Sequence, residues 1–257
     1  MANLGVVYFN QGANFMDYQP LAERLVLWIR EQVLSAGCQG VVFGLSGGVD
    51  SSVVAVLCHR TFLENTLGVL MPCYSSPEDA EHAELLASKF SIPTKTVVLD
   101  RVFDTLLGVL SSEKETSGSS QRVRANLKVR LRMLSLYYFA NQLGYLVVGS
   151  GNRSELATGY FTKYGDGGVD ILPIGNLVKG EVRGLARFLG VPQPIIDKPP
   201  SAGLWPGQTD EGELGFSYEE LDRYLITGQG SRQFKERIEA RMAVSAHKRR
   251  LPPVPGL

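Results

Sequence analysis

The chain has 257 residues, and its 26 basic residues (Lys plus Arg) equal its 26 acidic residues (Asp plus Glu) in number. This balance argues against the broad positive surface by which general nucleic-acid-binding proteins attract their ligand. The cysteines Cys38, Cys58 and Cys73 form neither a CxxC motif nor a Cys/His cluster, so neither a zinc site nor a redox pair is indicated. No apolar run approaches the roughly 20 residues of a membrane span, and no signal peptide is recognisable, so we expect a cytoplasmic protein.

The length suits one large α/β domain or two small ones, and it is sufficient to bury a core without disulfides. No internal repeat is visible, and no shift in composition marks a linker. We therefore expect residues 1–257 to form a single domain. Residues 1–17 carry no pattern to which we assign a function.

Residues 18–36 have apolar side chains at helical spacing among charged ones, which predicts a helix that covers the core. The apolar run at residues 41–45 predicts a buried parallel strand, and a further helix is predicted from Ser51. Between them lies SGGVDS, in which Gly47 and Gly48 can take positive φ and present no Cβ to a bulky anion. A tight turn between a strand and the free amides of a helix N-terminus is typical of phosphate-binding loops.

The acidic residue Asp50 stands inside this turn, which contains no Lys and is therefore not a Walker A loop. A carboxylate repels a bare phosphate, but a divalent cation can bridge the two groups, so we predict that Asp50 is a metal ligand. The alternative is an ordinary Ser/Gly turn in which Asp50 caps the helix. The complete SGGVDS string resembles the pyrophosphate-binding loop of the ATP pyrophosphatases, and this resemblance favours the metal ligand.

Strand and helix patterns then alternate along the chain. A helix is predicted at residues 77–90, and further strands are predicted at residues 67–71, 95–99, 145–149 and 171–174. This alternation predicts an α/β fold, a doubly wound and mostly parallel five-stranded sheet with helices on both faces, which binds ligands beyond the carboxyl ends of its strands. Residues 71–81 leave a strand at that edge, so they either border the nucleotide site or form a simple connection.

The predicted helix at residues 123–143 has a basic face. Asn126 and Arg130 lie one helical turn apart on it, close enough to face the same ligand. The alternative is a solvated basic face without a ligand. The next connection, residues 150–170, tips the balance toward a ligand, because it carries several charges among many glycines and is therefore expected to form a wall of an active site.

Three later features complete the pattern. Lys179 lies in the first turn of a predicted helix, where the helix dipole is unfavourable to a cation, so a phosphate is its expected contact. Residues 197–215 are rich in Pro and Gly and too long for an idle connector, which predicts a lid loop without regular structure. The basic group at residues 247–250 ends the last helical segment, and it is either a ligand contact or a solvated surface.

Taken together, SGGVDS, NLKVRLRM, SELATGYFTKYGDGGVD, the helix of Lys179, PPSAGLWPGQTDE and AHKRR are similar to the ammonia-dependent NAD synthetases. The similarity extends from about residue 18 to residue 252. It implies an adenine nucleotide alpha hydrolase-like fold and a homodimer. It also implies that nicotinic acid adenine dinucleotide (deamido-NAD) binds across the subunit interface, while ATP binds in each subunit's own loop.

The resemblance also assigns roles to individual residues. It implies an ATP site made of Gly44, Leu45, Ser46, Gly47, Gly48, Val49, Asp50, Ser51, Ser150, Lys179 and Ser201. It implies a deamido-NAD site made of Asn126, Arg130, Tyr137, Lys163, Asp170, His247 and Lys248. Asp50 and Glu155 would bind Mg²⁺, and the expected catalytic residues are Asp50, Lys179 and Asp166, the last as the base for ammonia. The family commonly has Thr where this chain has Ser150 and Ser201, but either hydroxyl can donate to phosphate.

The implied reaction is the last step of NAD biosynthesis. The nicotinate carboxylate attacks the α-phosphorus of ATP, pyrophosphate leaves, and ammonia displaces AMP from the acyl adenylate. A tRNA-thiolating ATP pyrophosphatase is a rival, but the chain lacks paired catalytic cysteines and a net positive charge. A nucleotide-binding regulator that never turns over is a second rival. No cysteine has an evident His partner for a glutaminase reaction, so we expect free ammonia to be the nitrogen donor.

Overall fold

The computed structural model describes residues 16–111, 120–205 and 207–256. Its strands are β1 (Gly40–Gly44), β2 (Thr66–Leu70), β3 (Thr94–Thr96) and β4 (Tyr145–Val148). The helices of the first half are α1 (Tyr18–Ser35), α2 (Val49–Thr61), α3 (Pro77–Phe90), α4 (Asp100–Leu110) and α5 (Ser120–Leu143). Those of the second half are α6 (Arg153–Thr158), α7 (Lys179–Leu189), α8 (Gln193–Asp197), α9 (Asp210–Leu214), α10 (Tyr218–Thr227), α11 (Arg232–Val244) and the 3₁₀ helix η1 (Ala246–Arg249).

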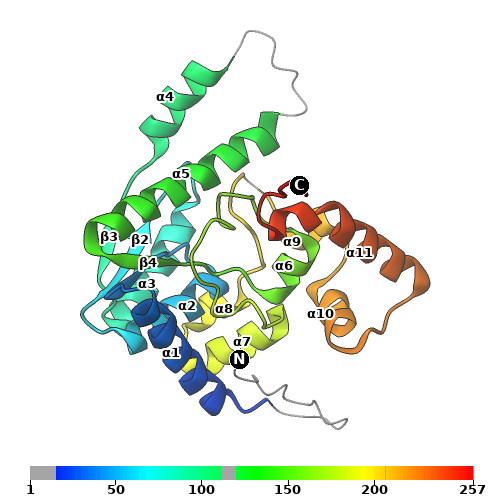
Figure 1. The fold of residues 1–257 in the computed structure, drawn as a ribbon, viewed down its shortest axis with the longest axis horizontal. Coiled ribbons are helices and arrows are strands. Elements are labelled where there is room, and N and C mark those ends of the chain that lie inside the picture. The colour runs from blue at the N-terminus through cyan, green and yellow to red at the C-terminus, as the bar shows by residue number, and fades with distance from the viewer. Residues whose placement is uncertain (1–15, 112–119, 206, 257) are drawn as a thin grey trace.

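The strands form one parallel sheet in the order β3-β2-β1-β4, and helix α5 crosses in front of it in the view of Figure 1. The chain builds outward from β1 through β2 to β3 and then returns to place β4 on the other side of β1. Such a reversal is a topological switch point, where the loops that leave two adjacent strands separate and open a crevice. The loop after β1, which contains SGGVDS, and the loop after β4 therefore begin side by side.

The residues that the structure describes form four strands, where the sequence predicted five. At the predicted fifth strand only Ile171 pairs, in a single parallel bridge to Val148. The segment cannot extend that pairing because Pro173 has no N–H to donate. The chain instead turns, with the Gly175 N–H bonded to the Leu172 carbonyl at 3.1 Å.

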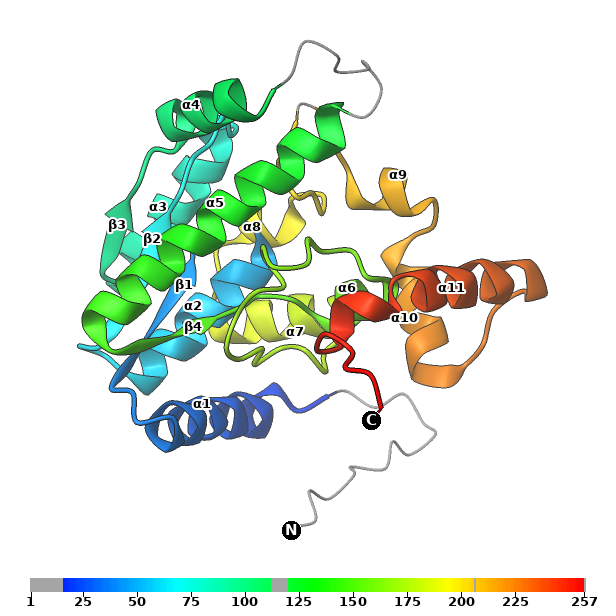
Figure 2. The ribbon, with the colours of Figure 1, turned by 45° about the horizontal axis from the view of Figure 1, so that its top comes forward.

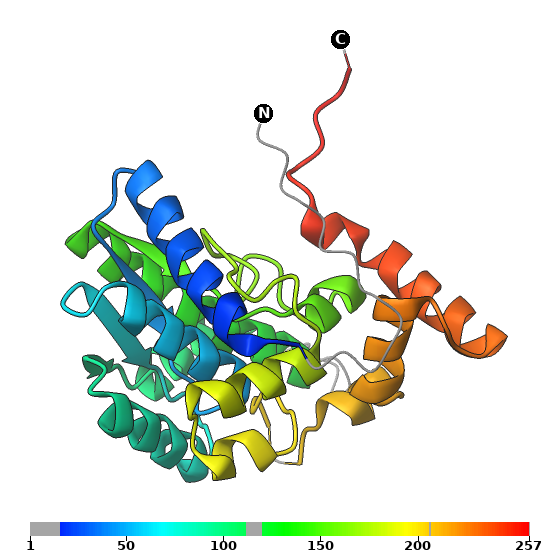
Figure 3. The ribbon, with the colours of Figure 1, turned by 90° about the horizontal axis from the view of Figure 1, so that it is seen from below.

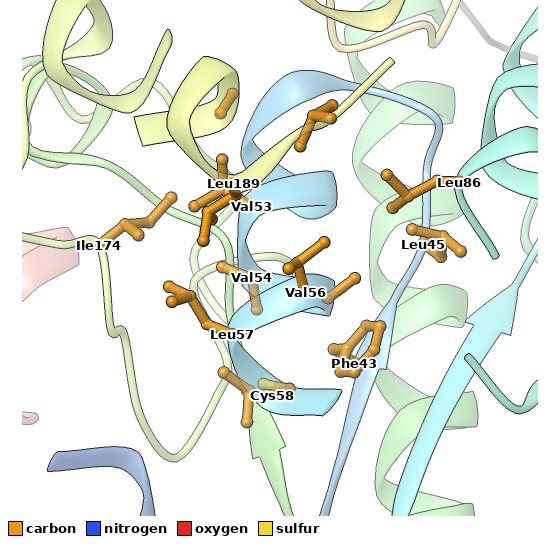
Figure 4. Packing of buried hydrophobic residues seen from close by; sticks show 14 of the residues in the cluster. Phe43, Leu45, Val53, Val54, Val56, Leu57, Cys58, Leu86, Ile174 and Leu189 are labelled. Carbon is orange, nitrogen blue, oxygen red and sulfur yellow. The ribbon is translucent and has the colours of Figure 1, made fainter. Parts of the chain in front are cut away.

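Helices cover both faces of the sheet, as the sequence predicted (Figure 2). Successive residues of β1 alternate between the faces: Val42 joins the cluster with Phe139 of α5, and Phe43 joins the cluster with Val53 of α2. Figure 4 shows the second cluster, in which α2 presents Val53 to one side and Val56 to another. Helix α2 is buried on nearly every side because β1, α1 and α7 all pack against it, so the start of this helix is firmly held.

Helices α10 and α11 lie at one end of the molecule, away from the sheet and beside α6 and α7 (Figure 3). They have a small core of their own that contains Leu214, Phe216, Leu221 and Ile238. In the described part of the chain, no helix combines the length and the apolar character needed to cross a membrane. Helices α10 and α11 lie beside the edge of the sheet at which the predicted site residues gather.

Candidate active site

The loop between β1 and α2 has the conformation that its glycines predict. Gly47 has a φ of +78°, and a Cβ at this position would lie 2.2 Å from the carbonyl oxygen of Asp79, so a larger residue is excluded. The hydroxyls of Ser46 and Ser51 lie 2.9 Å apart, and the Ser51 hydroxyl donates to the Gly48 carbonyl at 2.9 Å. No side chain caps α2, so the amides at its start have no partner within the helix, and Gly48, Val49 and Asp50 line the cleft.

A charged cluster adjoins this loop. The Lys179 ammonium donates to Asp50 and lies 3.9 Å from Glu155 Oε1. Asp50 also accepts from the Asn152 amide at 2.9 Å. Lys179 is only 3% exposed, so this ammonium is almost wholly removed from solvent.

The local sequence explains how Glu155 and Asn152 reach the cluster. They form a capping box at the start of α6, in which the Glu155 N–H donates to Asn152 Oδ1 at 3.0 Å and the Asn152 N–H donates to Glu155 Oε2 at 3.1 Å. We did not predict a role for Asn152 from the sequence. The spacing N-x-x-E at residues 152–155 was the signal that could have revealed it.

Two carboxylates share one ammonium in this cluster, so ionising both of them would leave an excess of negative charge. Burial, and then the nearby charge of Asp50, raise the pKa of Glu155 to about 8, while Lys179 opposes this shift. Burial lowers the pKa of Lys179, but Asp50 and Glu155 together outweigh burial, and the net shift is upward. The cluster would therefore be stabilised by a further cation.

Mg²⁺ fits this donor set. Among the described residues no group of three or more His, Cys, Asp or Glu side chains is arranged to hold a metal ion. Mg²⁺, however, is usually held by one or two protein carboxylates together with substrate phosphates and water. The predicted ligands Asp50 and Glu155 flank the same ammonium beside the SGGVDS turn, so both carboxylates are close to the predicted position of the phosphates.

Most of the predicted deamido-NAD residues form a second group, apart from the charged cluster around Lys179. The Thr162 hydroxyl donates to Asn126 Oδ1 at 2.8 Å, so the loop at residues 159–170 is bonded to α5. Lys163 donates to the His247 carbonyl at 2.8 Å. Lys248 donates to the Gly159 and Phe161 carbonyls at 2.8 and 2.7 Å. The cations here are thus held by backbone carbonyls rather than by carboxylates.

Asp166 lies in the same loop and is exposed to the cleft. Its Oδ1 atom accepts from the Thr162 N–H at 2.7 Å, which fixes the carboxylate. Although the side chain is open to the cleft, desolvation by the surrounding walls raises its pKa, against the opposing effect of the Thr162 hydrogen bond. A fixed carboxylate with a raised pKa is suited to accept a proton.

The charged cluster around Lys179 and the group around Lys163 and Asp166 line one cleft of about 1350 Å³. Its walls include the predicted residues Gly44, Leu45, Ser46, Gly48, Val49, Asp50, Ser51, Asn126, Ser150, Glu155, Lys163, Asp166, Lys179, Ser201, His247 and Lys248. Four predicted residues are not in its wall: Gly47, Arg130, Tyr137 and Asp170. Gly47 shapes the turn from behind, and the other three lie around the outer side of α5.

This outer group is also connected. The Arg130 guanidinium donates to the Lys163 carbonyl at 3.3 Å, and the Tyr137 hydroxyl donates to Asp170 Oδ1 at 2.9 Å. Tyr137 lines a second, shallower cavity of about 640 Å³ with Leu134. The residues that the sequence predicted as one deamido-NAD site therefore lie in two places in a single subunit, the cleft and an outer surface.

The predicted lid, residues 197–215, is more regular than we expected. It contains the short helix α9, which Thr209 caps by accepting from the Gly212 N–H. The Lys198 ammonium anchors the start of the lid through Asp79 at 2.8 Å and Glu78 at 3.2 Å. The Asp210 N–H closes its neck by donating to the Pro200 carbonyl at 3.0 Å. The expectation of no regular structure was therefore wrong for α9.

Comparisons with known proteins agree closely with one another. The family model for NAD synthase matches residues 21–252. An NH3-dependent NAD+ synthetase of Carboxydothermus hydrogenoformans is 50% identical over 243 residues, which cover 94% of this chain and 99% of that one. The structure of an NMN synthetase from Francisella tularensis has a TM-score of 0.89 and 37% identity, covering 95% of this chain and 100% of that one. That of an NH3-dependent NAD synthetase from Campylobacter jejuni has a TM-score of 0.77 and 32% identity, covering 94% and 100%.

Proposed function

The chain belongs to the NAD synthase family, and from this premise we propose that it is a ligase that converts deamido-NAD and ammonia into NAD at the expense of ATP. AMP and pyrophosphate are the other products. The observation that carries the proposal is that one cleft joins the phosphate-binding turn with Lys179 to the loop of Lys163 and Asp166. ATP and an acid substrate bound at these two places meet inside a single site.

In the first step the nicotinate carboxylate attacks the α-phosphorus of ATP and pyrophosphate leaves. Negative charge then gathers on the leaving group, beside the amides at the start of α2 and the Lys179 ammonium. Preorganised donors of this kind stabilise such a transition state far more than solvent does, commonly by several kcal/mol. Ser46, Ser51, Ser150 and Ser201 are the hydroxyls that hold the phosphates, each of them in the wall of the cleft.

Asp50 and Glu155 are the residues that would hold Mg²⁺. When bound, this ion neutralises phosphate charge and acts as a Lewis acid toward the pyrophosphate. Lys179 separates and partly neutralises the two carboxylates until ATP arrives. Asn152 then keeps Asp50 oriented by donating to its other oxygen atom.

In the second step ammonia attacks the acyl carbon of the adenylate and AMP leaves. The attacking nitrogen must lose a proton, which Asp166 accepts on the carboxylate that Thr162 holds in place. Residues 198–205 of the lid line the same cleft, and closure of the lid over bound ATP would keep water from the adenylate. Water would otherwise hydrolyse the adenylate to the starting acid and AMP, and ATP would be consumed without forming NAD.

The dinucleotide is held by Asn126, Lys163, His247 and Lys248 in the cleft, and Arg130, Tyr137 and Asp170 complete its site at a subunit interface. A homodimer accounts for the outer position of the last three. Leu134 and Tyr138 are each 64% exposed beside Tyr137 on α5, an apolar surface of the kind that subunit contacts bury. Sedimentation of the wild type should give the mass of a dimer, and Leu134→Glu should shift it toward the monomer and weaken deamido-NAD binding.

The test of the reaction is the stoichiometry of its products. Purified protein with ATP, Mg²⁺, ammonium and deamido-NAD should form AMP and NAD in equal amounts, whereas a regulator that only binds nucleotide would form neither. Because one similar structure is described as an NMN synthetase, nicotinic acid mononucleotide is the second acid to test. A higher kcat/KM with the mononucleotide than with deamido-NAD would identify the mononucleotide as the preferred substrate, and the proposed reaction steps would stay the same. We also propose that the chain forms a single domain and that it acts in the cytoplasm.

A further inference from the structure

The lid carries a buried carboxylate that neither step above uses. Asp210 is the first residue of α9 and is only 4% exposed, although most acidic side chains of this chain lie on its surface. It also lines the cleft. A carboxylate is costly to remove from water unless charges or hydrogen bonds compensate for it, so its partners indicate what it does.

The partners of Asp210 lead to Lys179. Oδ2 of Asp210 accepts from the Tyr218 hydroxyl at 3.0 Å. The ring of the same tyrosine, which is 3% exposed, lies under the Lys179 ammonium, with Nζ 5.2 Å from the ring centroid. Tyr218 therefore contacts the lid carboxylate with its hydroxyl and the active-site cation with its ring.

Asp210 lacks a full set of hydrogen bonds. Its Oδ1 atom is buried and has no hydrogen-bond partner among the described residues. Burial raises the pKa of Asp210, and the charge of Lys179 is the strongest influence that opposes this shift. The Lys179 ammonium and the hydroxyls of Tyr218 and Tyr160 therefore share the stabilisation of this carboxylate, with the ammonium as the largest contribution.

The position of Asp210 in the lid gives this pairing a purpose. Its backbone N–H closes the lid by donating to Pro200, which precedes the proposed ATP contact Ser201. When Asp50 and Glu155 are engaged with a metal ion, Lys179 has less negative charge to hold it. The lid carboxylate accepts from the hydroxyl of the same tyrosine whose ring contacts Lys179, so a movement of the lid would change the surroundings of this ammonium.

We propose that Asp210 is a positioning residue for Lys179, which it holds through charge and through Tyr218 so that closure of the lid sets the ammonium against the ATP phosphates. This inference rests on the proposed function, since Lys179 matters through the pyrophosphate leaving group. It makes lid closure part of the electrostatic site, in addition to excluding water.

The first test is kinetic. Asp210→Asn keeps an oxygen that can accept from Tyr218 but removes the charge, and we expect kcat to fall by about 10–100-fold, the usual cost of losing a residue that orients a functional group. KM for deamido-NAD should stay within about twofold, because this substrate lies on the other side of the cleft. Glu211→Gln is the matched control. Glu211 is the next acid on α9 and accepts from the Tyr218 backbone N–H at 2.8 Å, but it is not among the charges that act on Lys179.

The second test needs no activity. The change in melting temperature caused by Asp210→Asn should be more positive in a Lys179→Met background than in the wild type, because without the ammonium the buried carboxylate is uncompensated. Equal changes in both backgrounds would overturn the inference. So would an Asp210→Asn variant with the kcat of Glu211→Gln. In either case the wild type and Glu211→Gln would still form NAD, so failure of the inference is distinct from failure of the proposed function.

Discussion

The two sides of the cleft hold their cations in different ways. On the side of the phosphate-binding turn, Lys179 is 3% exposed and lies among Asp50, Glu155 and Asp210. On the opposite side, Lys163 and Lys248 donate only to backbone carbonyls of the described chain and have no carboxylate in ion-pair contact. One side is thus a preformed cluster in which a buried ammonium contacts carboxylates, and the other presents ammonium groups whose direct partners are backbone carbonyls.

This difference matches two different tasks. Charge that develops only in the transition state is best met by fixed, buried groups, which cost no reorganisation at the moment of reaction. An anionic substrate that must bind and leave is better met by cations with weak carbonyl partners, which a phosphate can replace. We therefore expect substitutions in the buried cluster to lower kcat, and substitutions on the opposite side to raise KM for deamido-NAD.

The largest effect should come from Asp50→Asn, which breaks the buried cluster. We expect kcat to fall by about 100-fold or more, because the phosphates lose a metal ligand at the point where charge develops. The melting temperature should fall as well, since Asp50, in the first turn of α2, is the closest charge partner of the buried Lys179 ammonium. Asp17→Asn is the control, because it alters another helix N-terminal Asp far from the cleft and Asn caps a helix equally well. An Asp50→Asn enzyme with the wild-type rate would contradict the metal role.

Asp166→Asn sharpens the comparison by separating the two chemical steps. Exchange of labelled pyrophosphate into ATP, which needs no ammonia, should stay near the wild-type rate, while NAD formation falls by about 100-fold or more, as for loss of a general base. The raised pKa of Asp166 gives this step a pH dependence. Only the deprotonated form accepts a proton, so the wild-type rate of the second step should fall as pH drops through this raised pKa. Equal losses in exchange and in NAD formation would remove Asp166 as the base.

Lys163→Ala tests the opposite side. Removing a cation from the proposed deamido-NAD site should raise KM for this substrate by about tenfold, as expected for the loss of a charged hydrogen bond, while KM for ATP stays within about twofold. His247→Ala should act in the same direction. Lys89→Ala, at the exposed end of α3, should change neither constant. A rise confined to KM for ATP would show that the two sides of the cleft are assigned the wrong way round.

The smallest effect concerns the lid. Its closure is secured by Lys198 at one end and by the Asp210 neck, both of them local contacts that can open without unfolding the core. Limited proteolysis at residues 201–209 should slow most when an ATP analogue, Mg²⁺ and deamido-NAD are present together, and less with any one alone. Cleavage at an unchanged rate under all conditions would argue against a ligand-coupled lid.

The sequence predicted what depends on short, local patterns. The strand, glycine turn and helix around SGGVDS were predicted because each residue type has a strong backbone preference there. The absence of a fifth strand was not predicted. The apolar residues at 171–174 suggest a strand, but the structure has a single bridge at Ile171, and Pro173 ends the pairing. Helix α9 was overlooked in a Pro- and Gly-rich segment, although Thr209 followed by three acids in the first turn is a helix-start pattern.

The division of the site was beyond the reach of the sequence for a different reason. Asn126, Arg130 and Tyr137 share a helix, but whether each faces the cleft or the outer surface depends on how α5 is rotated against the sheet. That rotation is set by packing of Phe139 and Leu136 on strands far away in the chain. Asp210 was likewise invisible, since its importance comes from Tyr218 and Lys179 rather than from its neighbours.

The most direct test of the account is the nitrogen donor. Purified protein should form NAD from deamido-NAD, ATP and an ammonium salt, with one AMP released for each NAD, and the nitrogen of labelled ammonium should appear in the amide. Replacing ammonium with ammonia-free glutamine should abolish the product, because no cysteine in the described cleft wall could act as a glutaminase nucleophile. Robust synthesis from glutamine by this chain alone, or AMP release without a new amide, would contradict the account.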